Sequence, residues 1–233
     1  MDFKNRTVML TGAAGHLGKA VASAFAARGA QLVLVDRQQD ALQAAFGSLS
    51  NSALVPADLL ERQQTQAALA AAVERFGRLD VLCHLAGGFR MGEAVHETRD
   101  STWNFLFDIN ARTLVNIAHA VVPHMVERGG GKIVNVGAYA AQKGVAQMGA
   151  YCASKSSVIR LTEAMSAELK EKNINVNCVL PTIIDTPENR AGMPDADPGR
   201  WVAPPALAEV IVFLSSDAAR AIHGAAVPVT GLS

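Results

Sequence analysis

Short apolar runs of strand length alternate with longer helical stretches along the whole chain, and this alternation restricts the possible folds most strongly. Parallel strands need a crossover connection, which is usually a helix, so the alternation predicts a parallel sheet with helices on both faces. We therefore expect an α/β fold with a doubly wound, seven-stranded parallel sheet, whose ligands bind at the carboxyl ends of the strands. The expected strands lie near residues 8–10, 31–35, 53–55, 79–85, 132–136, 175–180 and 225–229, and the expected helices, besides one after the first strand, lie near residues 61–76, 101–128, 151–172 and 204–216.

One domain spanning residues 1–233 is expected, because a chain of this length with 50% hydrophobic residues suits a single large core. The only long irregular segment carries several prolines and glycines between residues 187 and 205. Loops of that length in compact domains are usually functional. We therefore expect a substrate lid at about residues 186–204.

The junction between the first strand and the helix that follows it is rich in glycine. Gly12, Gly15 and Gly18 follow the apolar run at residues 8–10 and lead into a helical stripe. Glycines let a backbone turn tightly and approach a pyrophosphate, whose charge the amides at a helix amino terminus can bind. Together with His16 and Leu17, these glycines form the predicted phosphate-binding turn of a Rossmann arrangement.

Asp36 ends the second expected strand, at residues 31–35. A carboxylate at this point can accept hydrogen bonds from an adenosine ribose and would repel a 2′-phosphate, so it favours NAD(H) over NADP(H). Two alternatives stay open. Asp36 can be a simple turn residue at a strand end, and the adjacent Arg37 can neutralise a 2′-phosphate or stack on adenine instead.

Tyr151 and Lys155 stand four residues apart at the start of a helical stretch. This spacing places two side chains on one face of a helix. A tyrosine hydroxyl titrates near pH 10, so it needs a nearby positive charge, such as Lys155, before its phenolate forms readily. The alternative is a half-buried tyrosine beside a solvated lysine.

Composition excludes several other classes of protein. The chain has 21 basic and 21 acidic residues, so the positive footprint of a nucleic-acid binder is missing. Cys83, Cys152 and Cys178 fit neither a disulfide framework nor a zinc pattern, and no metal site is expected. The chain shows no apolar signal segment and no stretch long enough to span a membrane, so we expect a cytoplasmic protein that binds neither membrane nor nucleic acid.

Taken in order, these motifs resemble the short-chain dehydrogenase/reductase family across nearly the whole chain. The resemblance implies that Tyr151 is the catalytic acid or base, that Lys155 activates it and holds the ribose, and that Asn110 holds a water in a proton relay. It also implies that Asp58 is the acid near adenine. The segment that holds the nicotinamide carboxamide would contain Pro181, Ile184 and Thr186. The implied cofactor-binding residues are Gly12, Gly15, His16, Leu17, Gly18, Asp36, Arg37, Asp58, Leu59, Ala86, Gly87, Tyr151, Lys155, Pro181, Ile184 and Thr186.

The chain departs from the family pattern at two important places. Leu85 stands where most members carry the asparagine of an Asn-Ala-Gly run after the fourth strand, and the second departure lies nearer the chemistry. Ala138 stands thirteen residues before Tyr151, where most members carry the serine that donates a hydrogen bond to the substrate carbonyl. Quinonoid dihydropteridine reductases lack that serine and reduce an electron-poor conjugated ring with NADH. The chain resembles them at residues 86–89, at Ala138, at residues 185–197 and at Trp201.

The expected function is hydride transfer between NAD(H) and a small carbonyl or conjugated, quinonoid or pterin-like substrate. One alternative is an ordinary 3-oxoacyl or sugar-alcohol reductase. Another is a scaffold or sensor that binds NAD without turnover. Because helices 101–128 and 151–172 pair between subunits in many family members, a homodimer or homotetramer is also expected.

Overall fold

The computed structural model describes all residues 1–233. Its sheet has seven parallel strands in the order β3-β2-β1-β4-β5-β6-β7, which confirms the predicted fold class. Each strand overlaps one of the seven expected runs. The strands are β1 (Thr7–Thr11), β2 (Gln31–Asp36), β3 (Ser52–Pro56), β4 (Val81–His84), β5 (Gly131–Val136), β6 (Ile174–Pro181) and β7 (Ala226–Val229).

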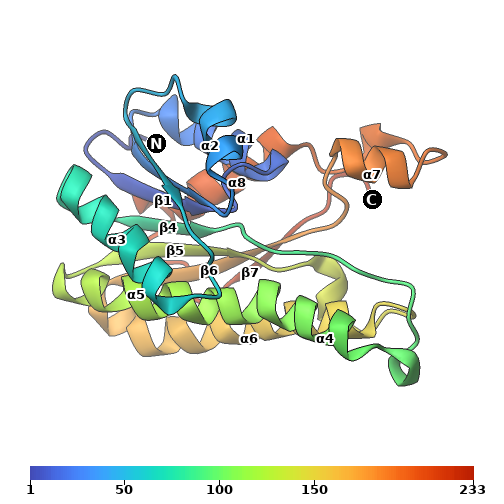
Figure 1. The fold of residues 1–233 in the computed structure, drawn as a ribbon. Coiled ribbons are helices and arrows are strands. Elements are labelled where there is room, and N and C mark those ends of the chain that lie inside the picture. Colours follow the sequence, from blue (N-terminus) through green and yellow to red (C-terminus); the bar gives the residue numbers. More distant parts are fainter.

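Two layers of helices cover the sheet (Figure 1). One face carries α1 (His16–Ala26), α2 (Gln39–Phe46) and α8 (Pro204–Leu214). The other face carries α3 (Arg62–Phe76), α4 (Asp100–Phe107), α5 (Thr113–Glu127) and α6 (Gly149–Leu169). The short α7 (Pro187–Gly192) lies apart from both layers, beside the carboxyl terminus. Turns of 3-10 helix occur at Val95–Glu97, Tyr139–Gln142, Lys170–Lys172, Pro198–Arg200 and Asp217–Ala219.

The apolar runs of the strands are continuous because the sheet is buried on both faces. In β1, Val8 and Leu10 belong to the core beneath α1 and α8, whereas Met9 belongs to the core beneath α3 and α5. Leu34 and Val35 of β2 divide between the two cores in the same way.

Three local features differ from the expectations. Helix α2 was not expected, because its eight residues bury only Leu42 and Phe46 and so give a weak periodic signal. The stretch expected as one helix at residues 101–128 is interrupted by a π-helical turn at Asp108–Arg112. The irregular segment contains α7, which Thr186 caps by accepting a hydrogen bond from the Asn189 amide at 3.3 Å.

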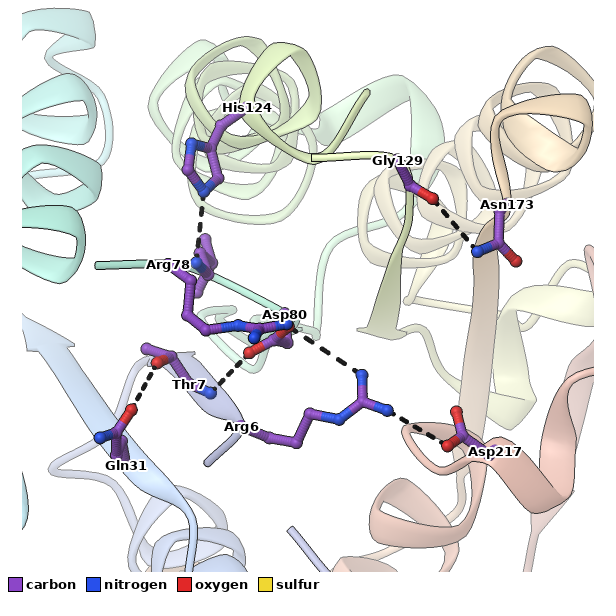
Figure 2. A network of polar contacts seen from close by, with 10 residues as sticks. Arg6, Thr7, Gln31, Arg78, Asp80, His124, Gly129, Asn173 and Asp217 are labelled. Atoms are coloured by element: carbon purple, nitrogen blue, oxygen red, sulfur yellow. Dashed lines mark hydrogen bonds and ion pairs between the residues drawn. The ribbon is translucent and has the colours of Figure 1, made fainter. Parts of the chain in front are cut away.

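A network of paired polar groups closes the amino-terminal edge of the sheet (Figure 2). Asp80, just before β4, accepts a hydrogen bond from the Thr7 amide at 2.9 Å and forms ion pairs with Arg78 and Arg6. Arg6 also pairs with Asp217 at 3.2 Å. This network holds together β1, β4 and the 3-10 turn after α8 at the edge opposite the cleft described below.

None of the helices combines the length and the apolar character that crossing a lipid bilayer requires.

Candidate active site

A cleft of about 380 Å³ opens at the carboxyl ends of β1, β2 and β4, where ligands of doubly wound sheets bind. Most of the residues that the sequence predicts as cofactor-binding line this one cleft. They are Gly12, Gly15, His16, Leu17, Gly18, Asp36, Arg37, Asp58, Leu59, Ala86, Gly87, Ile184 and Thr186.

The three glycines of the first turn differ in how much room each position leaves for a side chain. Gly12 has a φ of +66°, and a Cβ there would stand 2.9 Å from the Ala86 amide nitrogen. A Cβ on Gly18 would stand 2.3 Å from the carbonyl oxygen of Ala13. At Gly15, by contrast, the nearest atom would be the Gly12 oxygen at 3.4 Å, which is an ordinary contact. The fold therefore requires Gly12 and Gly18, whereas glycine at Gly15 leaves open a cradle in the cleft wall.

The amino end of α1 faces this cradle. Gly15 is the N-cap residue, and no side chain caps the helix, so its first amides have no side-chain acceptor. Unpaired amides at a helix amino terminus bind anions well, because the helix dipole adds to their hydrogen bonds. His16 reaches across to α7, where its Nε2 lies 3.1 Å from Glu188 Oε1. The cleft thus offers free backbone amides at the start of α1, and His16 links this turn to α7.

Asp36 is held rigidly at the end of β2. Its Oδ2 accepts a hydrogen bond from the Ala14 amide at 3.0 Å, and its Oδ1 accepts one from the Arg37 amide at 2.8 Å. A carboxylate has about four lone-pair sites, so both oxygens keep acceptor capacity for the hydroxyls of a sugar. Asp36 therefore supports the glycine turn and presents negative charge to the cleft.

Tyr151 and Lys155 lie in the first two turns of α6, where Lys155 is buried and Tyr151 is partly buried. Lys155 Nζ donates to the Val136 carbonyl oxygen at 2.8 Å. Burial lowers the pKa of Lys155 to about 8, since removal from water disfavours its charged form. Burial likewise raises the pKa of Tyr151 to about 12. The lowering of the tyrosine pKa expected from Lys155 is therefore not found in this structure, where burial and the neighbouring Cys152 both raise that pKa, and the phenol is protonated at neutral pH.

Phe89 contributes to the burial of Tyr151. The two rings meet edge to face with centroids 4.8 Å apart, and Phe89 itself is 53% exposed. An exposed aromatic ring therefore covers the side of Tyr151 that faces outward.

Asn110 lies in the π-helical turn between α4 and α5 and is buried. Its amide group donates to the Gly88 carbonyl oxygen at 3.1 Å and to Ser154 Oγ at 3.0 Å, and its Oδ1 accepts from the Gly88 amide at 2.9 Å. A Cβ on Gly87 would stand 2.9 Å from Lys155 Nζ and 3.0 Å from Asn110 Oδ1. The two polar groups therefore face the same small space, which glycine leaves free. Such π turns occur often at functional sites.

The buried His84 links β1 to α5 beside the cleft. His84 Nδ1 lies 2.9 Å from Thr11 Oγ1, and its Nε2 lies 3.3 Å from Thr113 Oγ1. Because Thr113 already donates its hydroxyl proton to the Ile109 carbonyl at 2.7 Å, it accepts from His84, which assigns the ring proton to Nε2. Burial lowers the pKa of His84 to about 3, so the ring is neutral and ties β1 to α5.

Ala138 is buried, at 5% exposure, in a small apolar cluster against which Tyr151 packs. The neighbouring members of this cluster are also apolar, among them Leu114 and Ile159. Tyr139, which could offer a hydroxyl in place of a serine, is 42% exposed. The side chain at Ala138 offers no hydrogen-bond donor.

The expected lid is held by local contacts. Arg190 forms hydrogen bonds to both carboxylate oxygens of Asp185, at 2.6 and 2.8 Å, and Asn189 donates to the Ile184 carbonyl oxygen at 2.8 Å. Trp201 is buried at 7% exposure. Arg200 donates to the Leu232 carbonyl oxygen at 2.7 Å, so the carboxyl-terminal tail packs against this segment.

The predicted site residues and the residues that line the cleft are not the same set. Asn110, Tyr151, Lys155 and Pro181 do not line the cleft itself. The sequence analysis missed several residues that do, and most of them adjoin predicted ones, so proximity along the chain could have identified them. Thr113 has no neighbour among the predicted residues. The missed residues are Ala57, Leu60, Leu85, Ile109 and Thr113.

Comparisons with known proteins agree with this geometry. A family model described as short chain dehydrogenase matches residues 6–196. The D-threitol dehydrogenase of Mycolicibacterium smegmatis is 33% identical, over 99% of this chain and 94% of that protein. The 3-oxoacyl-(acyl-carrier-protein) reductase of Thermotoga maritima is 29% identical, over 99% of this chain and 98% of that protein. A solved structure of the 3-ketoacyl-(acyl-carrier-protein) reductase from Brucella melitensis, complexed with NADH, is similar with a TM-score of 0.88 and 28% identity, over 98% of each chain.

Proposed function

The chain belongs to the short-chain dehydrogenase/reductase family of oxidoreductases, and within that family we propose that it is an NAD(H)-dependent enzyme acting on a small carbonyl or conjugated substrate. The observation that carries this proposal is the pairing of Lys155 with Tyr151. An ammonium group is buried with a single carbonyl as its hydrogen-bond partner, four residues from a partly buried phenol. Burial of a charge costs free energy, and perturbed titratable groups of this kind cluster at catalytic sites.

The cleft supports NAD(H) as the cofactor. Gly15 leaves room at the free amino end of α1 for a pyrophosphate, and Asp36 would accept hydrogen bonds from ribose hydroxyls and repel a 2′-phosphate. When bound, the nicotinamide ring supplies or accepts the hydride. Ile184 and Thr186 line the cleft at the side of α7, where they would hold the carboxamide end.

Tyr151 is proposed to move the proton. A phenol with a pKa of about 12 is protonated at neutral pH and can donate to a substrate oxygen as negative charge develops there. Lys155 would stabilise the resulting phenolate by its positive charge. It would then pass a proton back to Tyr151 through water in the small space that Lys155 shares with Asn110. Neither step needs a group from outside the chain except water.

The substrate is proposed to be an electron-poor carbonyl or conjugated compound, of the quinonoid or pterin-like kind. A plain ketone needs a hydrogen bond on its oxygen in the transition state, and the buried Ala138 offers none. A conjugated acceptor can delocalise the charge within its own π-system. The exposed ring of Phe89 beside Tyr151 would give such a flat substrate an aromatic wall.

A second candidate function rests on the relatives. One relative, 33% identical to this chain, is a D-threitol dehydrogenase, and another, 29% identical, is a 3-oxoacyl-(acyl-carrier-protein) reductase. A sugar-alcohol dehydrogenase or a 3-oxoacyl reductase is therefore the main competitor. A third candidate is an NAD-binding scaffold without turnover, which the phenol of Tyr151 beside Lys155 disfavours, because simple binding does not require a tyrosine hydroxyl.

We also propose assembly into a homodimer or homotetramer in the cytoplasm. Trp103 and Val115, on α4 and α5, are 46% and 43% exposed, and the Trp103 ring stacks on Phe107 at 4.4 Å. A second copy of the chain would cover this apolar surface. Light scattering at micromolar concentration should return a multiple of 24.5 kDa.

Substitution of Ala138 by serine tests the proposed substrate class. With NADH as reductant, wild type should reduce quinones and quinonoid dihydropterin with higher kcat/KM than simple ketones or 3-oxoacyl thioesters. Ala138→Ser should raise ketone reduction, toward the factor of about 10²–10³ that one such donor supplies elsewhere, and change conjugated substrates much less. Efficient ketone reduction by wild type, unchanged in Ala138→Ser, would mean that another donor serves, and Tyr139 would be the next residue to replace. Oxidation of threitol with NAD⁺ as the preferred reaction would favour the second candidate.

A further inference from the structure

A small hollow of about 10 Å³, enough for a single water molecule, includes Tyr151 in its wall. The chain after β4 forms one side of it, and the first residues of α6 form the other. Two charged residues line this hollow, Arg90 and Glu93. Their charges have opposite signs, so the electrostatic character of the hollow depends on whether they neutralise one another.

Glu93 is neutralised by a different residue. Its Oε1 accepts hydrogen bonds from Arg99 Nε at 2.6 Å and from Thr102 Oγ1 at 3.0 Å, and its Oε2 accepts one from the Arg99 amide at 3.2 Å. The hydrogen bond from the Arg99 side chain is the largest cause that lowers the pKa of Glu93. Glu93 is therefore ionised and already supplied with donors, and the positive charge of Arg90 remains uncompensated.

Arg90 has no carboxylate partner and donates no hydrogen bond within the protein, although eight arginine–carboxylate ion pairs form elsewhere in the chain. Its guanidinium carbon lies 4.0 Å from the centroid of the Phe105 ring, so the planar group stacks on an aromatic face. Stacking of this kind orients a guanidinium without using its five N–H donors. Arg90 is thus held in place with its hydrogen-bonding capacity free.

Arg90 lies near Tyr151, the proposed proton donor. The preceding residue, Phe89, touches the ring of Tyr151 at 4.8 Å between centroids, and Arg90 and Tyr151 line the same hollow. Because Arg90 is exposed, a molecule whose reacting oxygen lies at Tyr151 would reach its guanidinium along the surface rather than through this small hollow. A guanidinium fork matches the two oxygens of a carboxylate in geometry as well as in charge.

We propose that Arg90 binds a carboxylate on the substrate, so that the preferred substrates are small carbonyl or conjugated acids rather than neutral compounds. This inference rests on the proposed function, because it assigns the substrate class of the same site. It makes Arg90 a specificity-determining residue that acts on substrate binding, without a role in proton or hydride transfer.

Binding of matched acids and esters to the protein with NAD⁺ tests the proposal without requiring turnover, because a ketone cannot be reduced by the oxidised cofactor. Pyruvate, acetoacetate and levulinate, each paired with its methyl ester, vary the distance between carbonyl and carboxylate. By calorimetry, at least one acid should bind wild type about tenfold more tightly than its ester. This preference should disappear in Arg90→Gln, be partly retained in Arg90→Lys, and weaken as salt is added.

Arg112→Gln is the matched control, because Arg112 is an exposed arginine on the neighbouring π turn that pairs with Asp108. It should keep the full preference for acids. Equal binding of acids and esters by wild type, absence of binding by all of them, or an unchanged preference in Arg90→Gln would each overturn the proposal. A preference for acids that depends on Arg90, in a protein that reduces no member of the substrate panel with NADH, would support the anion site and count against the proposed function alone.

Discussion

Charged side chains have partners at the amino-terminal edge of the parallel sheet, whereas Lys155 and Arg90 have few or none at the carboxyl-terminal edge. At the amino-terminal edge, Asp80 is paired with Arg78 and Arg6 and accepts from the Thr7 amide (Figure 2). At the carboxyl-terminal edge, Lys155 is buried with a single carbonyl partner and Arg90 has no carboxylate partner.

The difference separates what stabilises this fold from what the fold can bind. Polar groups that satisfy one another contribute to stability and have little capacity left for a ligand. Polar groups that lack partners reduce stability but remain available to a cofactor or substrate, which is the usual trade-off at functional sites. Substitutions at the amino edge should therefore change stability alone, and substitutions at the carboxyl edge should change function.

The largest effect is expected from Tyr151→Phe at the carboxyl edge. Loss of the hydroxyl removes the proposed proton donor and should lower kcat/KM by about 10²–10⁴, the usual contribution of a general acid or base. The affinity for NADH, followed by nicotinamide fluorescence, should stay nearly the same, because the aromatic ring remains. A Tyr151→Phe variant that loses NADH binding would show that the hydroxyl serves binding rather than proton transfer.

Lys155→Met should sharpen the comparison by removing activity while stabilising the fold. Burial lowers the pKa of Lys155 from 10.5 to about 8, so protonated Lys155 costs the folded state roughly 3 kcal/mol. The unfolded chain binds more protons than the folded one between these two values, so this cost is complete below pH 8 and declines as pH rises toward 10.5.

The melting temperature of Lys155→Met should accordingly exceed that of wild type near pH 7, and the difference should shrink toward pH 10.5. The loss of the hydrogen bond to Val136 reduces the gain by about 1 kcal/mol. Thermal unfolding across this pH range measures the effect. A variant less stable than wild type at every pH would show that the hydrogen bond outweighs the burial of the charge.

The sequence predicts the regular parts of this structure better than the irregular ones, for physical reasons that particular residues make clear. The seven strands and the glycine turn were predictable because buried runs, such as residues 8–10, and glycines with restricted geometry, such as Gly12, leave local signals. The π turn that contains Asn110 was not predictable, since the apolar periodicity continues through it. The placing of Phe89 on Tyr151 and the lysine bond to Val136 depend on tertiary packing between distant segments, which no local pattern encodes.

At the amino edge, Asp80→Ala should lower stability without changing catalysis. The substitution leaves the buried Thr7 amide without its acceptor and Arg78 without its partner. An unsatisfied buried group costs about 1–3 kcal/mol, which for a chain of this size lowers the melting temperature by about 2–4 °C per kcal/mol. Asp80→Asn keeps an acceptor oxygen and should lose less. A change in kcat/KM at 25 °C in either variant would contradict the separation of the two edges.

The smallest expected effect concerns Asp36, because this residue belongs to both categories: it supports the glycine turn and faces the cleft. NADH should bind wild type at least tenfold more tightly than NADPH, which corresponds to about 1.4 kcal/mol. Asp36→Ala should narrow this gap, but it also removes the acceptor of the Ala14 amide and so can weaken the binding of both cofactors together.

Asp36→Asn separates the two contributions, since its side-chain oxygen can still accept from Ala14 while the charge is gone. If repulsion of the 2′-phosphate sets the preference, the asparagine variant should lose the discrimination while keeping most of its affinity for NADH in fluorescence titrations. Equal affinities for the two cofactors in wild type would instead mean that the adjacent Arg37 neutralises the 2′-phosphate despite Asp36.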